Sequence, residues 1–194
     1  MLNIHPMQTT VETRPQPLAD QPMWFAMSAT FGRELKAQAF LESRGVRCFI
    51  PMHAQMVTDR RQGKVRKLVP AISNLIFAYT TRQRIQSLKS LVEYLHYLTK
   101  PMGGKNVPIT IPDGQMEHFI RVCQTLNEKL VYLAPDEINL DKGTPVRIVG
   151  SAFDGVEGTF VKVGRKKQVV VLVQGVAAVM VAEFTDGYLE VLEH

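Results

Sequence analysis

The sequence predicts an α+β protein with two folded domains, a mixed helix–strand domain followed by a small β-barrel. Three observations lead to this prediction. Apolar, strand-like runs alternate with segments of helical periodicity as far as residue 126. From residue 144 onward only short β-rich runs remain, separated by turn signals. The charge changes at the same place: residues 21–126 carry fifteen Lys and Arg against six Asp and Glu, a net +9, whereas residues 141–194 carry six against seven, a net −1.

The first elements follow from local composition. Residues 1–21 are rich in proline and poor in apolar bulk, which predicts a disordered tail. Residues 23–30 are apolar throughout and predict a strand covered on both faces. A helix is expected over residues 32–44, capped by Thr30 and ended by Gly45. Its expected apolar stripe contains Leu35, Ala39 and Phe40, with Ala37 and Leu41 beside them.

The middle of the chain predicts a charged hairpin. Residues 46–58 and 68–80 have strand character, and Pro70 indicates an edge or a bulge at the start of the second strand. Between them, residues 59–67 form a hairpin tip with five cations, which makes nucleic-acid phosphate a suitable partner. The cations are Arg60, Arg61, Lys64, Arg66 and Lys67.

The first domain ends with two further helices. Residues 81–93 are amphipathic and begin after a Thr80–Gln83 capping box. Arg82 and Arg84 open this helix, where cations oppose the helix dipole, so they are candidates for contacts with nucleic acid. A strand over 94–99, a loop over 101–108 and a helix over 113–126 capped by Asp113 follow.

The element order of residues 22–126 is β-α-β-β-α-β-α, the ferredoxin-like split βαβ plan with one extra helix. Residues 127–143 are acidic and lack a period, which predicts a linker. Residues 144–194 hold five β-rich runs and predict a five-stranded SH3-like barrel.

Composition argues against several functional classes. Two cysteines, Cys48 and Cys123, without a C-x-x-C pair disfavour a zinc knuckle or a disulfide scaffold. The five histidines are scattered and no phosphate loop or nucleophile elbow is present, so we expect no metal, no cofactor and no enzyme. No signal peptide or membrane-spanning run is evident, which predicts a cytoplasmic protein that does not bind membranes.

Two segments carry a family resemblance. The succession WFAMSAT, GRELKAQAFLESRG and VRCFIPM, with Trp24–Phe25 at an aromatic pair, resembles the N-terminal (NGN) domain of NusG-like transcription factors. Residues 146–163, VRIVGSAFDGVEGTFVKV, resemble the KOW motif, in which Gly155 and Gly158 turn one strand into the next. Ser73 and Leu75 depart from the housekeeping pattern, and we therefore expect a specialised, operon-dedicated factor similar to RfaH or to capsule-locus antiterminators.

The resemblance implies a function and a set of sites. A monomeric NusG-like factor binds the clamp helices of the largest RNA polymerase subunit, bridges the DNA cleft and suppresses pausing, while its KOW barrel recruits Rho or a ribosomal protein. The polymerase-binding residues would be Phe25, Ile72, Asn74, Leu75 and Phe77. Upstream or non-template DNA would lie near Arg33 and Lys36 and near the cations of the hairpin and the second helix. Phe153 would contact the partner of the barrel.

Several alternatives stay open at this stage. The chain could be a housekeeping NusG-type factor, or a ribosome- or RNA-binding KOW protein. Core packing is the competing interpretation for the apolar candidates, and a solvated turn is the competing interpretation for the charged hairpin.

The barrel is expected to keep its β structure in the free protein. Four valines in residues 169–173 and the recurring glycines disfavour a helical form. We therefore expect a tethered barrel that leaves the docking face open or only loosely covered.

Overall fold

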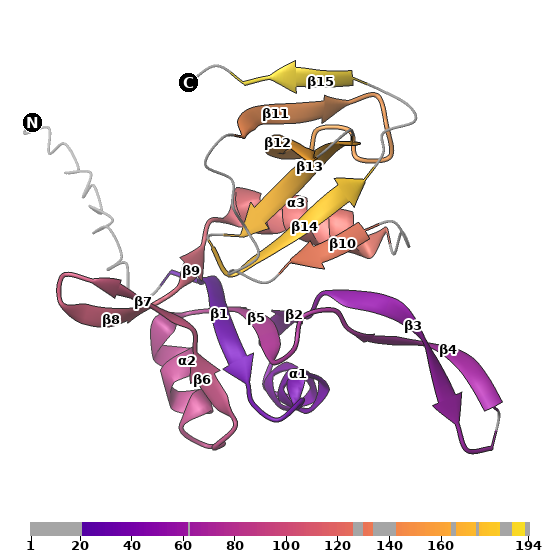
Figure 1. The fold of residues 1–194 in the computed structure, drawn as a ribbon. Helices are drawn as coiled ribbons and strands as arrows, with labels where there is room; N and C mark the ends of the chain where they lie inside the picture. The colour runs from indigo at the N-terminus through magenta and orange to yellow at the C-terminus, as the bar shows by residue number, and fades with distance from the viewer. Residues whose placement is uncertain are drawn as a thin grey trace, which may run out of the picture.

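The computed structural model of the chain describes residues 21–61, 63–125, 130–133, 143–163, 166–173, 175–182 and 188–192. The first domain is built on an antiparallel sheet with the order β2-β5-β1-β6, to which β9 adds through β1 (Figure 1). Its elements are β1 (Met23–Ala29), α1 (Glu34–Glu42), β2 (Arg47–Phe49), β5 (Leu75–Thr80), α2 (Arg82–Lys89), β6 (Leu95–Tyr97), β9 (Thr110–Ile111) and α3 (Asp113–Gln124). The α+β prediction is confirmed.

Strand alternation divides the core of this domain into two layers. Along β1 and β5, residues such as Trp24 and Phe77 face α3, whereas Phe25 and Ile76 face α1 and α2. Both faces of these central strands are therefore buried, which is why their sequences are apolar without alternation. Residues 23–29 thus form the predicted strand, covered on both faces.

Two separate hairpins extend from the sheet. The first pairs β3 (Met52–Asp59) with β4 (Gly63–Pro70) and projects away from the body of the domain (Figure 1). The strands expected over 46–58 and 68–80 are each interrupted, at residues 50–51 and 71–74, so the hairpin leaves the main sheet. The second hairpin pairs β7 (Thr99–Met102) with β8 (Lys105–Pro108), where the sequence predicted a loop. Positive φ angles at Gly103 and Gly104 suit a tight hairpin turn, which explains this correction.

The helix ends differ from those expected. α1 begins at Glu34 without a side-chain cap, and the buried positions are Glu34, Ala37 and Leu41, whereas Leu35 is exposed. α3 also lacks the expected side-chain cap from Asp113, because its N-cap is Pro112. In both cases a strand of the sheet precedes the helix. The position of that strand, rather than a capping side chain, determines where the helix begins.

Thr81, and not Thr80, caps α2. The Arg84 backbone N–H donates to Thr81 Oγ1 at 3.3 Å, while the Thr80 side chain is buried at the end of β5. We expect Thr81→Ala to lower the free energy of unfolding by about 1 kcal/mol, because the amide at the start of the helix loses its acceptor. Thr81→Ser keeps the acceptor and serves as the control. Equal urea midpoints for wild type and Thr81→Ala would contradict this role.

The second domain is the predicted barrel with five strands. β11 (Thr144–Val149), β12 (Glu157–Val163), β13 (Lys166–Val173), β14 (Ala177–Ala182) and β15 (Tyr188–Val191) form one antiparallel sheet. A sixth strand, β10 (Leu130–Leu133), pairs with β14 from within the segment expected to be a linker. The rest of that segment, except Gly143, and residues 1–20 of the expected tail lie outside the described residues.

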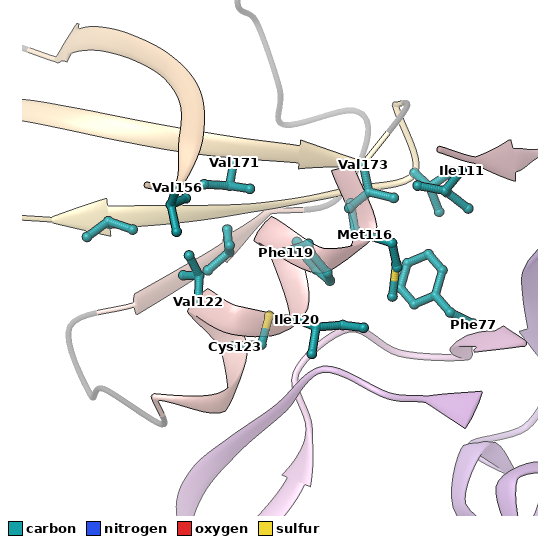
Figure 2. Packing of buried hydrophobic residues seen from close by; sticks show 14 of the residues in the cluster. Phe77, Ile111, Met116, Phe119, Ile120, Val122, Cys123, Val156, Val171 and Val173 are labelled. Carbon is teal, nitrogen blue, oxygen red and sulfur yellow. The ribbon is translucent and has the colours of Figure 1, made fainter. Parts of the chain in front are cut away.

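Helix α3 lies between the sheet of the first domain and the barrel. One buried cluster includes Phe77 from the sheet, Met116 and Phe119 from α3, and Val171 and Val173 from the barrel (Figure 2). Hydrogen bonds between described residues also join the domains. Glu157 N–H donates to His118 Nδ1 at 3.3 Å, and Tyr132 Oη donates to the Met52 carbonyl at 3.2 Å. The barrel is β-structured as expected, but the face that the sequence left open is covered.

Candidate functional site

The apolar residues assigned to polymerase docking sit in the layer under α3. Leu75 and Phe77 are 3% and 0% exposed, and the Phe77 ring lies 5.9 Å from the Phe119 ring of α3. Ile72 is only partly buried and packs against the edge of the same cluster. Of these three residues, Ile72 is thus the one that a partner can reach without moving α3.

Phe25 does not join this set. It faces the opposite side of the sheet, beneath α1 and α2, and its ring lies 5.9 Å from that of Tyr97. Trp24 is the aromatic residue on the α3 face, where its ring lies 5.2 Å from Tyr79 and 5.1 Å from the Arg47 guanidinium carbon. The strict alternation of a strand separates the two neighbours, so Phe25 shares no surface with Leu75 and Phe77.

Asn74 has a structural task in this fold. Its backbone has a φ of +62°, and its side-chain Oδ1 accepts from the Gly32 N–H at 3.0 Å. Its own N–H donates to Glu34 Oε1 at 2.5 Å, and its carbonyl accepts from the Ala29 N–H at 2.7 Å. These bonds tie the start of β5 to the turn between β1 and α1, and they explain why the carboxylate of Glu34 is buried.

The β1–α1 turn holds a residue that sequence reasoning missed. Phe31 has a φ of +63°, which is a strained conformation for a bulky side chain and costs about 1–2 kcal/mol. Phe31 is 86% exposed, more than any other large apolar residue in the described part of the chain. The signal in the sequence was an aromatic residue directly before Gly32 at the end of an apolar strand.

Arg33 and Lys36 are exposed beside this turn, Arg33 at the N-cap of α1 and Lys36 in its first turn. The Arg33 guanidinium carbon lies 5.5 Å from the Phe31 ring centroid and 5.4 Å from that of Tyr94. Lys36 Nζ lies 5.2 Å from the Tyr94 centroid. Phe31, Arg33 and Lys36 are exposed, whereas Tyr94 is buried beneath the two cations. We call this group the turn patch: Phe31, Arg33, Lys36 and Tyr94.

The cations of the β3–β4 hairpin divide between its turn, where Arg60 and Arg61 lie, and its two faces. Residues directly opposite in an antiparallel pair share a face. Thr58 pairs with Lys64, and Met56 with Arg66, so both cations share one face with Met56 and Leu68, which are 60% and 51% exposed.

Lys67 lies on the other face of the hairpin, where its Nζ forms an ion pair with Asp59 Oδ2 at 3.2 Å. Asp59 Oδ1 also accepts from the Arg61 N–H at 2.9 Å, which shapes the turn. The face with Lys64 and Arg66 is thus the more cationic and the more accessible one.

Arg82 and Arg84 have neighbours within the domain. The Arg84 guanidinium donates to the Arg44 carbonyl at the C-terminal end of α1, and so joins the two helices. Burial raises the pKa of the Tyr97 hydroxyl, and the positive charge of Arg82 opposes that rise. Arg84 therefore has a structural role that competes with the predicted nucleic-acid contact.

Phe153 is buried in this structure. The sequence suggested that a ring in this glycine-containing turn is hard to bury, but Phe153 is 7% exposed and belongs to the cluster that spans α3 and the barrel. The left-handed Gly150 and Gly155 turn the chain back on both sides of it, and its N–H donates to Ser151 Oγ at 3.1 Å. A partner could reach this ring only after a rearrangement of the domain interface.

Both cysteines pack against the core layers of the first domain. Burial raises the pKa of both Cys48 and Cys123 to about 12, so both thiols stay protonated and unreactive at neutral pH. Among these residues no group of three or more His, Cys, Asp and Glu could hold a metal ion. A cavity of about 370 Å³ lies between α3 and the barrel, lined in part by Gln115, His118 and Glu157. None of the helices in the described part combines the length and apolar character that crossing a bilayer requires.

Comparison with known proteins identifies the family of the chain. The model of the NusG family, described as transcription termination factor nusG, matches residues 22–120. A solved structure described as "Domain interaction in Thermotoga maritima NusG" is similar at 19% identity, covering 84% of this chain and 93% of that chain with a TM-score of 0.43. No curated protein matched the chain. Because the family model spans 99 of the 194 residues, this chain belongs to the NusG family of transcription factors, proteins that act on RNA polymerase and are not enzymes.

Proposed function

We propose that this chain is a transcription elongation and antitermination factor that binds the clamp of RNA polymerase, bridges the DNA cleft and suppresses pausing or termination. One observation carries the proposal: the family match over residues 22–120 coincides with the domain that holds the net charge of +9. Such a charge suits a domain that works beside DNA. Transcription also places its site of action in the cytoplasm.

The clamp helices would dock at the α3 side of the sheet, with Ile72 at the accessible edge. Trp24, Leu75 and Phe77 would support this surface from beneath, since they are buried in the same layer. The barrel packs on α3 from the other side.

DNA would follow two cationic surfaces of the domain. The hairpin face with Lys64 and Arg66, together with Arg60 and Arg61 at the turn, suits the phosphates of upstream duplex. Arg33 and Lys36 of the turn patch suit the non-template strand. Lys67 also forms an ion pair with Asp59, and Arg84 also donates to the Arg44 carbonyl, so both have structural roles beside any contact with DNA.

The barrel would recruit a further partner, Rho or a ribosomal protein, through Phe153 once it has separated from α3. The departures at Ser73 and Leu75 favour a factor that serves dedicated operons, such as polysaccharide loci.

The test is retention of the purified chain on core RNA polymerase without RNA, followed by single-round transcription on leader templates that contain pause sites. We expect binding and shorter pause lifetimes on a subset of templates. Equal activity on all templates would favour a housekeeping NusG-type factor. Binding to ribosomes or structured RNA without polymerase binding would contradict the proposal in favour of an RNA-binding KOW protein.

A further inference from the structure

The β1–α1 turn displays Phe31 in a way that the fold does not need. Phe31 is 86% exposed, and its backbone adopts a left-handed conformation that a glycine or asparagine would adopt with less strain. Strained backbone in an otherwise regular domain tends to occur where a side chain must be held for a ligand. Phe31 lies in the turn that joins β1 to α1.

The surroundings hold this turn rigidly. The Gly32 N–H donates to Asn74 Oδ1 at 3.0 Å, and the Asn74 N–H donates to the buried Glu34 carboxylate. The turn is thus anchored to the start of β5 in the central sheet. Phe31 is consequently presented on a fixed backbone, which lowers the entropic cost of binding a ligand to its ring.

The chemistry beside the ring identifies the ligand. Arg33 lies between the rings of Phe31 and Tyr94 at 5.5 and 5.4 Å, and Lys36 continues the row at 5.2 Å from Tyr94. Proteins that bind unpaired nucleic acid combine an aromatic ring, on which a base stacks, with cations that follow the phosphates. Base pairs of a duplex are stacked on each other, so an exposed ring on a turn favours a single strand.

We propose that Phe31 is a stacking platform for an unpaired base of single-stranded DNA, with Arg33 and Lys36 on the neighbouring phosphates. The ligand class rests on the proposed function, because a transcription factor at the DNA cleft meets the non-template strand in its unpaired form. The new element is the ring itself: it contacts a base, and it contributes affinity that depends on the presence of that base.

The direct test is a titration of the full chain, without polymerase, against a labelled single-stranded DNA of about 12 nucleotides and a matched abasic strand of equal charge. We expect Phe31→Asn to weaken binding to the normal strand by about tenfold, and binding to the abasic strand by less than about twofold. Phe31→Trp should restore the affinity. Met102→Ala, which removes a similarly exposed apolar side chain from the β7–β8 hairpin, is the control and should change neither titration.

Thermal unfolding separates binding from structure. Asparagine tolerates the left-handed backbone, so Phe31→Asn should not lower the melting temperature. A drop of several degrees would make Phe31 a structural residue and overturn the proposal. Equal loss of affinity on normal and abasic strands, or no loss on either, would overturn it as well. A matched RNA strand bound at least as tightly, with the same dependence on Phe31, would overturn the assignment to DNA.

The polymerase assays distinguish this inference from the function on which it rests. A chain that binds polymerase and shortens pauses, but shows no effect of Phe31 on either strand, refutes the stacking role alone. A chain that shows the base-dependent effect of Phe31, but is not retained on core polymerase, refutes the proposed function and leaves the single-strand site in place.

Discussion

Leu75→Asp is expected to unfold the first domain, whereas Ile72→Asp is expected to leave it folded and to abolish retention on core polymerase. Leu75 lies 3% exposed beneath α3, and an unpaired carboxylate there costs several kcal/mol, a large share of the total stability of roughly 5–15 kcal/mol. Ile72 lies at the partly exposed edge of the layer. An aspartate side chain at this position can reach water, so the domain stays folded, but it places a negative charge in the docking surface.

Circular dichroism and thiol labelling show whether each variant is folded or unfolded. Cys123 is buried in the same cluster, so in the folded chain a thiol reagent at neutral pH should label it slowly, and in Leu75→Asp rapidly. Leu91→Asp places the same charge at an exposed apolar position and is the control. A folded Ile72→Asp that still binds core polymerase normally would exclude this face as the docking site.

The second large effect is expected for the charged hairpin. Replacing Arg60, Arg61 and Lys64 with alanine should weaken antipausing and reduce the steepness of its salt dependence by about 2–3 in log–log slope, because each lost phosphate contact releases about one counterion fewer. Retention on the isolated clamp helices should survive, since the hairpin projects away from the sheet (Figure 1).

A control removes two cations from the other hairpin, Lys100→Ala with Lys105→Ala. This control should lower the net charge without the same reduction in the log–log slope of the salt dependence. A triple variant with unchanged activity over a salt series would show that the β3–β4 hairpin is only a solvated turn. An equal loss per cation removed in the triple variant and in the control would indicate a response to net charge alone.

Local patterns predicted the elements but not their partners. The apolar runs of β1 and β5, the cations of the hairpin and the β-rich runs of the barrel are all properties of contiguous residues, and the structure confirms each of them. The apolar stripe of α1 was predicted on the wrong residues. Alanines and other apolar residues occur on more than one side of this helix, so the sequence does not show which side is buried. Packing against the sheet buries Ala37 and Leu41.

The candidate site shows the same division. Arg33 and Lys36 were predicted from the family resemblance and the hairpin cations from their density in the sequence, and the structure shows Arg33, Lys36, Arg60 and Arg61 exposed. Phe25 and Leu75 could not be assigned to faces until the register between β1 and β5 was known. Phe31 was missed because a short pattern encodes neither its backbone conformation nor its exposure. Both depend on Asn74, which follows Gly32 by 42 positions and Glu34 by 40 positions in the chain and bonds to each of them.

By itself, the sequence determined the two-domain α+β plan, the basic first domain and the β structure of the barrel, because periodicity, charge and β-branched residues act locally. Only the tertiary structure decided that α3 is buried on two sides, that β10 leaves the expected linker to pair with β14, and that Phe153 is enclosed. Each of these features depends on contacts between apolar surfaces that are far apart in the sequence. Whether two such surfaces pack together is decided by their shapes and by strand register, which composition does not reveal.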